Sequence, residues 1–131
     1  MFKKALFLGI VSGILAGIAS VIYSRVYSNS TGASFFKVAS PTSMLLASLI
    51  GGILAAIGYW AIIRMLRKNG EIVFNLLFVI LSFATMLPAF GVKLPLDMSE
   101  PELFPGMVIP MHFFPVLAWL TLKPLFFRQQ A

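Results

Sequence analysis

The sequence predicts an all-α integral membrane protein, a four-helix bundle formed by residues 1–131 as one domain, with both termini in the cytoplasm. Composition is the first observation, because 60% of the 131 residues are hydrophobic and only 11% are charged. A soluble domain carries about 25% charged residues. The second is that four stretches each approach the ~20 apolar residues that a spanning helix needs. Cysteine is absent, which excludes disulfides, thiolate zinc sites and catalytic thiols.

The four predicted spans cover residues 5–24, 41–63, 72–90 and 106–127. The second has a clear start, because Ser40 can cap a helix and Pro41 suits the first helical position. Asn69-Gly70 stands in the short connection after it, so the second and third spans are expected to form an antiparallel hairpin. The other connections, residues 25–40 and 91–105, are longer and more polar.

Basic residues stand at the ends of the apolar stretches. This placement indicates topology signals and not a nucleic-acid-binding surface, although the formal net charge is +6. One side holds Lys3, Lys4, Arg64, Arg67, Lys68, Lys123 and Arg128, and the other holds Arg25, Lys37 and Lys93 with the acidic Asp97, Glu100 and Glu102. The positive-inside rule places the first side in the cytoplasm. The predicted location is the inner cell membrane, crossed several times, with the lipid bilayer as the first partner.

Small residues recur every four positions on the first two spans. They are Gly9, Gly13 and Gly17 on the first span, and Gly51, Gly52 and Ala55 with neighbouring small residues on the second. Such spacing lets helix backbones approach closely in lipid. Two interpretations stay open. The faces pack against each other within one chain, which we favour, or one of them joins a second copy or another membrane protein.

Polar residues inside the third and fourth spans form the candidate site. Asn75 and Ser82 share one helical stripe, Thr85 flanks it, and His112 stands early in the fourth span. At 1.5 Å per residue, Thr85 and His112 each lie roughly 20 Å from the cytoplasmic end of their span. Ser82, Thr85 and His112 are therefore expected to meet in the outer half of the bilayer.

Three roles for His112 compete, because ionisable groups in membrane spans are rare and raise a functional question. The first is structural, a neutral imidazole bonded to Ser82, Thr85 or a carbonyl freed by a nearby proline. The second is a small cavity in which the histidine binds a ligand or relays a proton. The third is a metal or haem ligand with Met107 and Met111, because thioether and imidazole suit Cu(I). The sequence favours the structural role and predicts no resident cofactor or metal.

Short motifs carry a family resemblance over residues 40–127. Their order is a small-residue second span, a basic turn, Leu81-Ser82 and Leu87-Pro88 in the third span, and Met111-His112 in the last. This order resembles a family of bacterial four-helix membrane proteins, a domain-of-unknown-function group. The resemblance implies the fold and a bacterial inner-membrane address, points to Ser82, Pro88 and His112, and implies no chemistry. By size and topology the chain is also similar to DoxX-type proteins, some of them linked to quinone oxidoreduction.

Three functions follow as predictions. The leading one is a non-enzymatic oligomeric or accessory subunit of a membrane complex. The alternative is a small-ligand binding or transport module with an outward-facing site near His112, and the third is a quinone- or haem-linked enzyme subunit. Catalysis is disfavoured, because all four carboxylates lie outside the spans and the sequence lacks GxSxG, HExxH, P-loop and dinucleotide motifs.

Overall fold

The computed structural model describes residues 1–91, 93–94 and 100–127. Asp97 and Arg128, used above in the charge count, lie outside the described residues. The elements in chain order are α1 (Phe2–Thr31), α2 (Pro41–Leu66), a 3₁₀ turn (Arg67–Asn69), α3 (Gly70–Ala84), α4 (Pro88–Gly91), a second 3₁₀ turn (Pro101–Leu103) and α5 (Phe104–Phe126). The described part of the chain is all-α and holds no strand.

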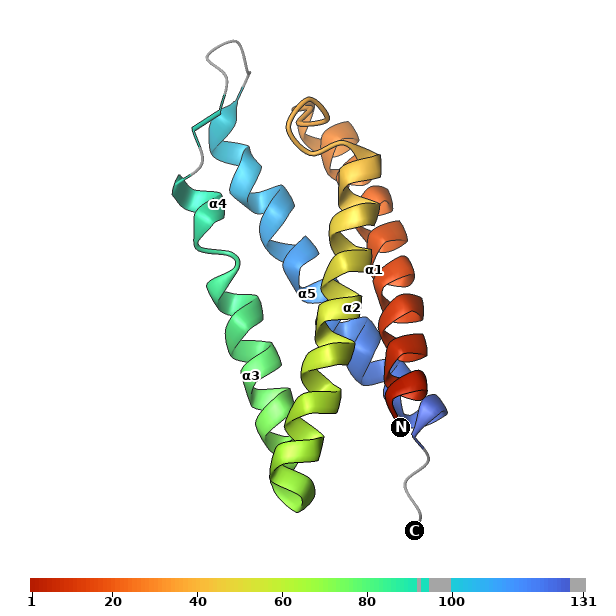
Figure 1. Ribbon diagram of the computed structural model, residues 1–131. Helices are drawn as coiled ribbons and strands as arrows, with labels where there is room; N and C mark the ends of the chain where they lie inside the picture. Colours follow the sequence, from red (N-terminus) through yellow and green to blue (C-terminus); the bar gives the residue numbers. More distant parts are fainter. Residues whose placement is uncertain (92, 95–99, 128–131) are drawn as a thin grey trace.

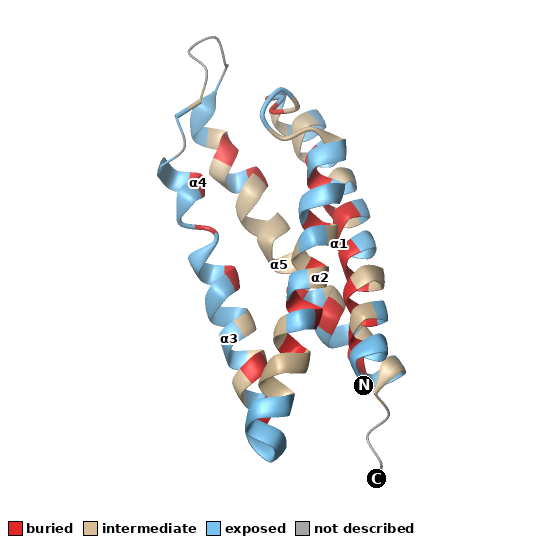
Figure 2. Cartoon of the chain, in the orientation of Figure 1, coloured by how far each residue is buried: buried red, intermediate tan, exposed pale blue. Residues whose placement is uncertain are grey.

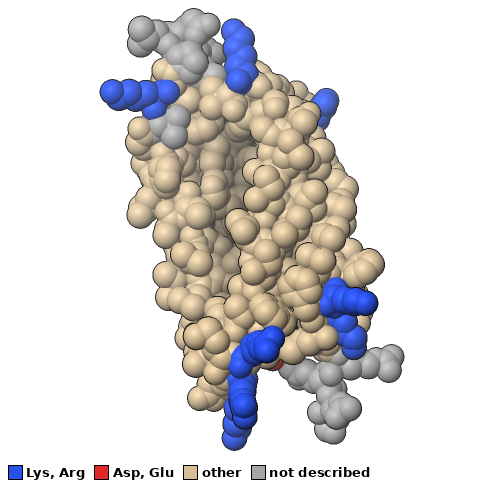
Figure 3. Space-filling view, in the orientation of Figure 1, with Lys and Arg blue, Asp and Glu red and all other residues tan. Residues whose placement is uncertain are grey.

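The helices lie roughly along one direction (Figure 1). α1 and α2 are side by side, α2 turns back into α3, and α5 passes behind the space between α2 and α3. The start of α1, the α2–α3 turn and the end of α5 lie at one end of the molecule. We call it the basic end, because Lys3, Lys4, Arg64, Arg67, Lys68 and Lys123 belong to these segments. On the face drawn in Figure 3, the charged side chains lie toward the two ends, with an uncharged surface between them.

Three helical stretches are long and apolar enough to cross a membrane: Phe2–Thr31, Pro41–Gly91 and Pro101–Phe126. Four separate spans were expected, and this expectation is corrected at the third, residues 72–90. α3 has 15 residues, which at 1.5 Å each gives ~22 Å, less than the ~30 Å of a hydrocarbon core. The second stretch therefore contains the whole α2–α3 hairpin together with α4.

Local hydrogen bonding ends α3 early. The Ser82 hydroxyl donates to the Phe78 carbonyl at 2.8 Å, and the Thr85 hydroxyl donates to the Ser82 carbonyl at 2.8 Å. Pro88 has no N–H for the carbonyl of Ala84, four residues earlier, and the Leu87 N–H bonds to that carbonyl instead at 3.3 Å. The helix therefore tightens into turns after Ala84 and resumes only as the four residues of α4.

α1 is longer than the predicted first span, whereas α2 starts where the sequence predicts. α1 continues past the predicted end at Ser24 to Thr31, and Gly32 ends it with φ 75°, donating its N–H to Ser28. A glycine suits this left-handed position because it has no Cβ. The predicted start of α2 is confirmed, because Pro41 is its first residue and the Ser40 hydroxyl accepts the Ser43 N–H at 3.2 Å.

Close backbone contact joins α1 to α2 through the predicted glycines. A Cβ on Gly9 would overlap the Gly52 carbonyl oxygen, and one on Gly13 would lie 2.8 Å from the Ser48 carbonyl oxygen. Gly17 faces Leu45 in the same way, and Ala55 is buried. Gly51 differs from the prediction, because a Cβ there would meet nothing within 4 Å. The small-residue face is thus used within the chain, with Gly51 turned away from it.

Two buried clusters hold the bundle, one near each end (Figure 2). The cluster at the basic end contains Ala5, Leu8, Ala55, Ala56, Tyr59, Phe74 and Trp119. The cluster at the opposite end contains Ala33, Phe35, Met44, Phe104 and Met107. Outward-facing side chains such as Phe7, Leu54 and Leu125 are apolar and more than half exposed. That pattern, with apolar groups outside as well as inside, is expected of a protein that lipid surrounds.

Candidate functional site

The structure places the residues of the predicted His112 site on hydrogen bonds within their own helices. The His112 Nδ1 lies 2.8 Å from the Val108 carbonyl oxygen, one turn earlier in α5. The hydroxyls of Ser82 and Thr85 donate to carbonyls of α3 and its end. Within the described residues, no hydrogen bond joins His112 to either hydroxyl. Each of these three side chains therefore has a backbone carbonyl as its hydrogen-bond partner, and the three are not hydrogen-bonded to one another.

A hollow runs along the face drawn in Figure 3, between the side formed by α3 and the side formed by α2. Residues 108–115 of α5, His112 included, are all of intermediate burial.

Met107, named above as a possible metal ligand, is 1% exposed and packs in an apolar cluster with Phe35, Met44 and Phe104. Met107 therefore has the surroundings of an ordinary core methionine, which fills space between apolar side chains.

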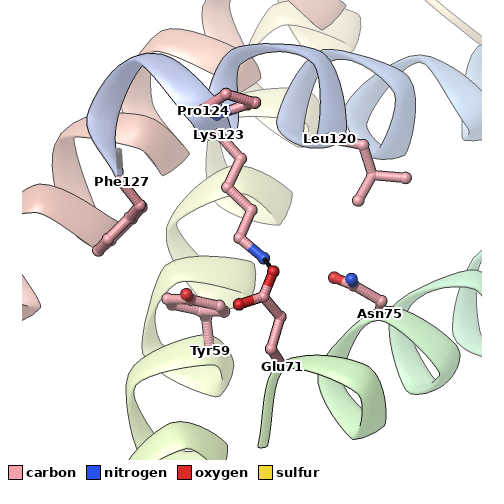
Figure 4. A pocket seen from close by; sticks show the side chains of 7 residues that line it. All are labelled: Tyr59, Glu71, Asn75, Leu120, Lys123, Pro124 and Phe127. Atoms are coloured by element: carbon pink, nitrogen blue, oxygen red, sulfur yellow. Dashed lines mark hydrogen bonds and ion pairs between the residues drawn. The ribbon is translucent and has the colours of Figure 1, made fainter. Parts of the chain in front are cut away.

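The polar residues that the fold does bring together lie at the basic end. A pocket of about 420 Å³ is lined there by side chains from three helices: Tyr59 of α2, Glu71 and Asn75 of α3, and Leu120, Lys123, Pro124 and Phe127 at the end of α5 (Figure 4). Asn75 is the one residue of the predicted ligand site that lines it. This pocket therefore lies toward the opposite end of the bundle from the site expected near His112.

An ion pair forms one wall of the pocket. The Lys123 ammonium donates to the Glu71 carboxylate at 2.5 Å and lies 5.1 Å from the centre of the Tyr59 ring. The lysine side chain is 10% exposed and the glutamate side chain 47% exposed. Glu71 stands in the first turn of α3 and Lys123 in the last turn of α5. Each charge therefore complements the dipole of its own helix as well as the other charge.

A hydrogen-bond acceptor without a partner lies beside this ion pair. The Oδ1 atom of Asn75 is buried and has no hydrogen-bond partner, and Figure 4 shows the amide directed toward the ion pair. Asn75 follows Glu71 by one helical turn, which puts both on one face of α3. Pro124 has no N–H for the Leu120 carbonyl, so that carbonyl lacks its usual helical donor. The pocket thus has acceptors to offer a bound molecule.

Aromatic rings support the pocket from the bundle interior. Tyr59 makes ring contacts with Phe74, Trp119 and Phe127 at centroid distances of 5.1, 5.7 and 5.4 Å, so that it joins α2, α3 and α5. Trp119 is fully buried, and its Nε1 has no hydrogen-bond partner among the described residues. Edge-to-face ring pairs of this kind fix the positions of the rings they join. The polar wall stands on this rigid support.

Sequence reasoning missed this site because it used Lys123 as a marker of topology and treated Glu71 only as a carboxylate outside the spans. A signal was available. The start of the third span and the end of the fourth lie on the same side of the membrane, so Glu71 and Lys123 stand at similar depth. Asn75, one turn from Glu71, was assigned to the stripe of Ser82 instead. Comparison with protein-family models, curated proteins and solved structures gives no match for this chain.

Proposed function

We propose that this protein is a membrane-embedded binding module for a small amphipathic molecule, whose polar head sits in the pocket of Glu71, Asn75 and Lys123. The observation that carries the proposal is the ion pair of the buried Lys123 with the half-exposed Glu71, beside the unpartnered Oδ1 of Asn75. An ion pair of this kind contributes little net stability, and ionisable groups within membrane segments are a functional hypothesis by default. A buried polar atom without a partner is costly, and a bound hydrogen-bond donor would remove that cost.

The division of the pocket walls supports an amphipathic ligand. Glu71, Asn75 and Lys123 form the polar part, whereas Leu120, Pro124 and Phe127 form an apolar part. Pro124 is exposed and Leu120 is 38% exposed at the outer surface of α5. A ligand head that donates a hydrogen bond to Asn75 would leave an apolar body against the α5 side. Such a molecule would reach the pocket from the lipid.

The proposed topology has four crossings, with α3 and α4 together as the third and both termini in the cytoplasm of a bacterial inner membrane. The start of α1, the α2–α3 turn and the end of α5 lie at the same end of the molecule. An even number of crossings is needed to return the chain to the end where it starts, and this supports four. The excess of cations at the basic end supports its cytoplasmic placement. The bacterial address rests on the resemblance described above. The ligand would then bind at the cytoplasmic side.

A second proposal is the accessory or oligomeric subunit, because one small-residue patch remains outside the α1–α2 contact. Ala47 is exposed, and Gly51, one turn further along α2, has open space where its Cβ would point. A transmembrane helix of a second copy or another protein could approach closely at this patch. Replacing Gly51 by Leu would then reduce the assembly in mild detergent, whereas a purified monomer unaffected by the change would argue against it.

The binding proposal is tested by replacing Asn75 with Leu, a residue of similar size. Removing an unpartnered buried acceptor should stabilise the empty protein by about 1 kcal/mol, and it should abolish retention of the ligand in native mass spectrometry after gentle extraction. Asn29→Leu, on an exposed part of α1, is the control and should retain the ligand mass. A wild-type protein that carries no extra mass would refute the proposal. A retained mass with a visible absorption band would support the quinone- or haem-linked alternative.

A further inference from the structure

A second feature of the basic end is an aromatic and basic corner formed by Phe2 of α1 and by Trp60 and Arg64 of α2. The Phe2 ring contacts the Trp60 ring edge-on, with centroids 5.5 Å apart and planes at 70°. The Arg64 guanidinium lies over the indole, 5.5 Å from its centroid. Trp60 is partly buried, whereas Arg64 and Phe2 are exposed. The indole is thus placed between an apolar ring and a cation.

Further exposed cations lie near this corner in the sequence, at the same end of the molecule. Lys3 and Lys4 follow Phe2 on α1, and Arg67 and Lys68 follow in the turn after α2. All are exposed, and within the described residues none of them, nor Arg64, forms an ion pair with a carboxylate. Glu71, the acidic residue of this end, is bonded to Lys123 instead. The corner therefore presents an unbalanced positive charge.

We infer that this corner binds the headgroup of an anionic phospholipid. A guanidinium that lies over an aromatic ring still has N–H groups that suit bidentate bonding to phosphate oxygens. Tryptophan is favoured at the headgroup level of a membrane, where its ring is part apolar and part polar. Phe2, which is 40% exposed, provides apolar surface beside it for the first part of an acyl chain.

The opposite end of the bundle provides a comparison within the same chain. Arg25 is exposed there, and so is Lys93. In the described part of the chain neither residue lies over an aromatic ring. A lipid held by charge alone would bind to either end in proportion to its cations. A lipid held by the corner requires the arginine that lies over Trp60. This inference does not depend on the pocket of Lys123, which is lined by different residues.

The test is native mass spectrometry of the full chain mixed with equal amounts of phosphatidylglycerol and phosphatidylcholine in mild detergent. The wild type should retain phosphatidylglycerol preferentially, and Arg64→Gln should weaken that retention about fivefold, the effect of one cation at a membrane surface. Arg25→Gln is the matched control and should leave it unchanged. Arg64→Lys keeps the charge and removes the planar group, so it should retain an intermediate amount. Millimolar inorganic phosphate should not compete, because the acyl chain contributes to binding.

Two results would overturn the inference. Equal retention of the two lipids by the wild type would show that the corner does not recognise an anionic headgroup. An equal loss in Arg25→Gln and Arg64→Gln would show that only the total charge matters. Circular dichroism of each variant verifies that the helices are formed, and all the replaced side chains are exposed. A wild type that prefers phosphatidylglycerol but carries no pocket ligand would refute the proposed function and leave this inference standing.

Discussion

Adjacent glycines in α2 offer a sharp test of the packing, because Gly51 and Gly52 differ by one position and face different surroundings. The three atoms nearest to a Cβ on Gly52 are all backbone atoms of α1: it overlaps the Gly9 carbonyl oxygen and lies 3.1 Å from the Gly9 carbonyl carbon and 3.2 Å from the Gly13 Cα. No side chain can rotate away to relieve this overlap. Gly52→Ala therefore forces the two helices apart, whereas Gly51→Ala meets nothing within 4 Å.

The expected magnitudes follow from these surroundings. Overpacking of a close contact costs about 1–3 kcal/mol, and a gap of up to 1 Å loses between a quarter and a half of each dispersion contact along it. Alanine favours the helix over glycine by about 1 kcal/mol. Gly52→Ala should therefore lose about 1–2 kcal/mol of stability, while Gly51→Ala should gain up to about 1 kcal/mol.

Stability in dodecylmaltoside micelles, titrated with SDS and followed by tryptophan fluorescence, measures both variants on one scale. Trp119 is fully buried beside the α1–α2 contact and reports its loss. Two variants within about 0.5 kcal/mol of each other would refute the close approach of Gly9 and Gly52. A stabilised Gly52→Ala would refute it as well.

Three further results are expected. Glu71→Gln should lower stability by about 1–3 kcal/mol, less than the loss for a fully buried pair, because Glu71 is half exposed. It should lower stability more than Lys123→Met does, since it leaves the 10%-exposed ammonium unpaired. Equal losses of stability in the SDS titration would contradict this. Tyr23→Phe should cost about 1 kcal/mol in the wild type and little in Pro110→Ala, because the Tyr23 hydroxyl bonds to the carbonyl that Pro110 leaves free; a double-mutant cycle measures the coupling. His112→Ala should leave the retained ligand mass unchanged in native mass spectrometry, and a mass lost with it would favour the site predicted from the sequence.

Periodicity and local signals predict much of this fold. Ser40 and Pro41 mark the start of α2, and the four-residue spacing of Gly9, Gly13 and Gly17 marks the face of α1 that packs. The same spacing does not distinguish Gly51 from Gly52. Both belong to runs of small residues, and one position along a helix is a rotation of about 100°. Only the partner helix determines which run is covered.

The end of α3 and the position of the site depend on contacts that a pattern does not contain. Ser82 and Thr85 have hydroxyls that can bond across a bundle or back to their own helix, and the sequence is the same in both cases. The structure has them bonded to their own helix. Glu71 and Lys123 are 52 positions apart, so their pairing depends on the antiparallel return of the chain. A depth comparison of charged residues between span ends would have predicted it.

The most direct test of the central claim places a photoreactive diazirine amino acid at position 120, on the pocket wall, in the protein within its own membrane. Leu117, one turn earlier on α5 and 58% exposed, provides the matched position facing outward. We expect irradiation to attach one small molecule of defined mass at position 120 and a mixture of lipids at position 117. The same lipid mixture at both positions would contradict it, since the pocket would then hold no ligand of its own.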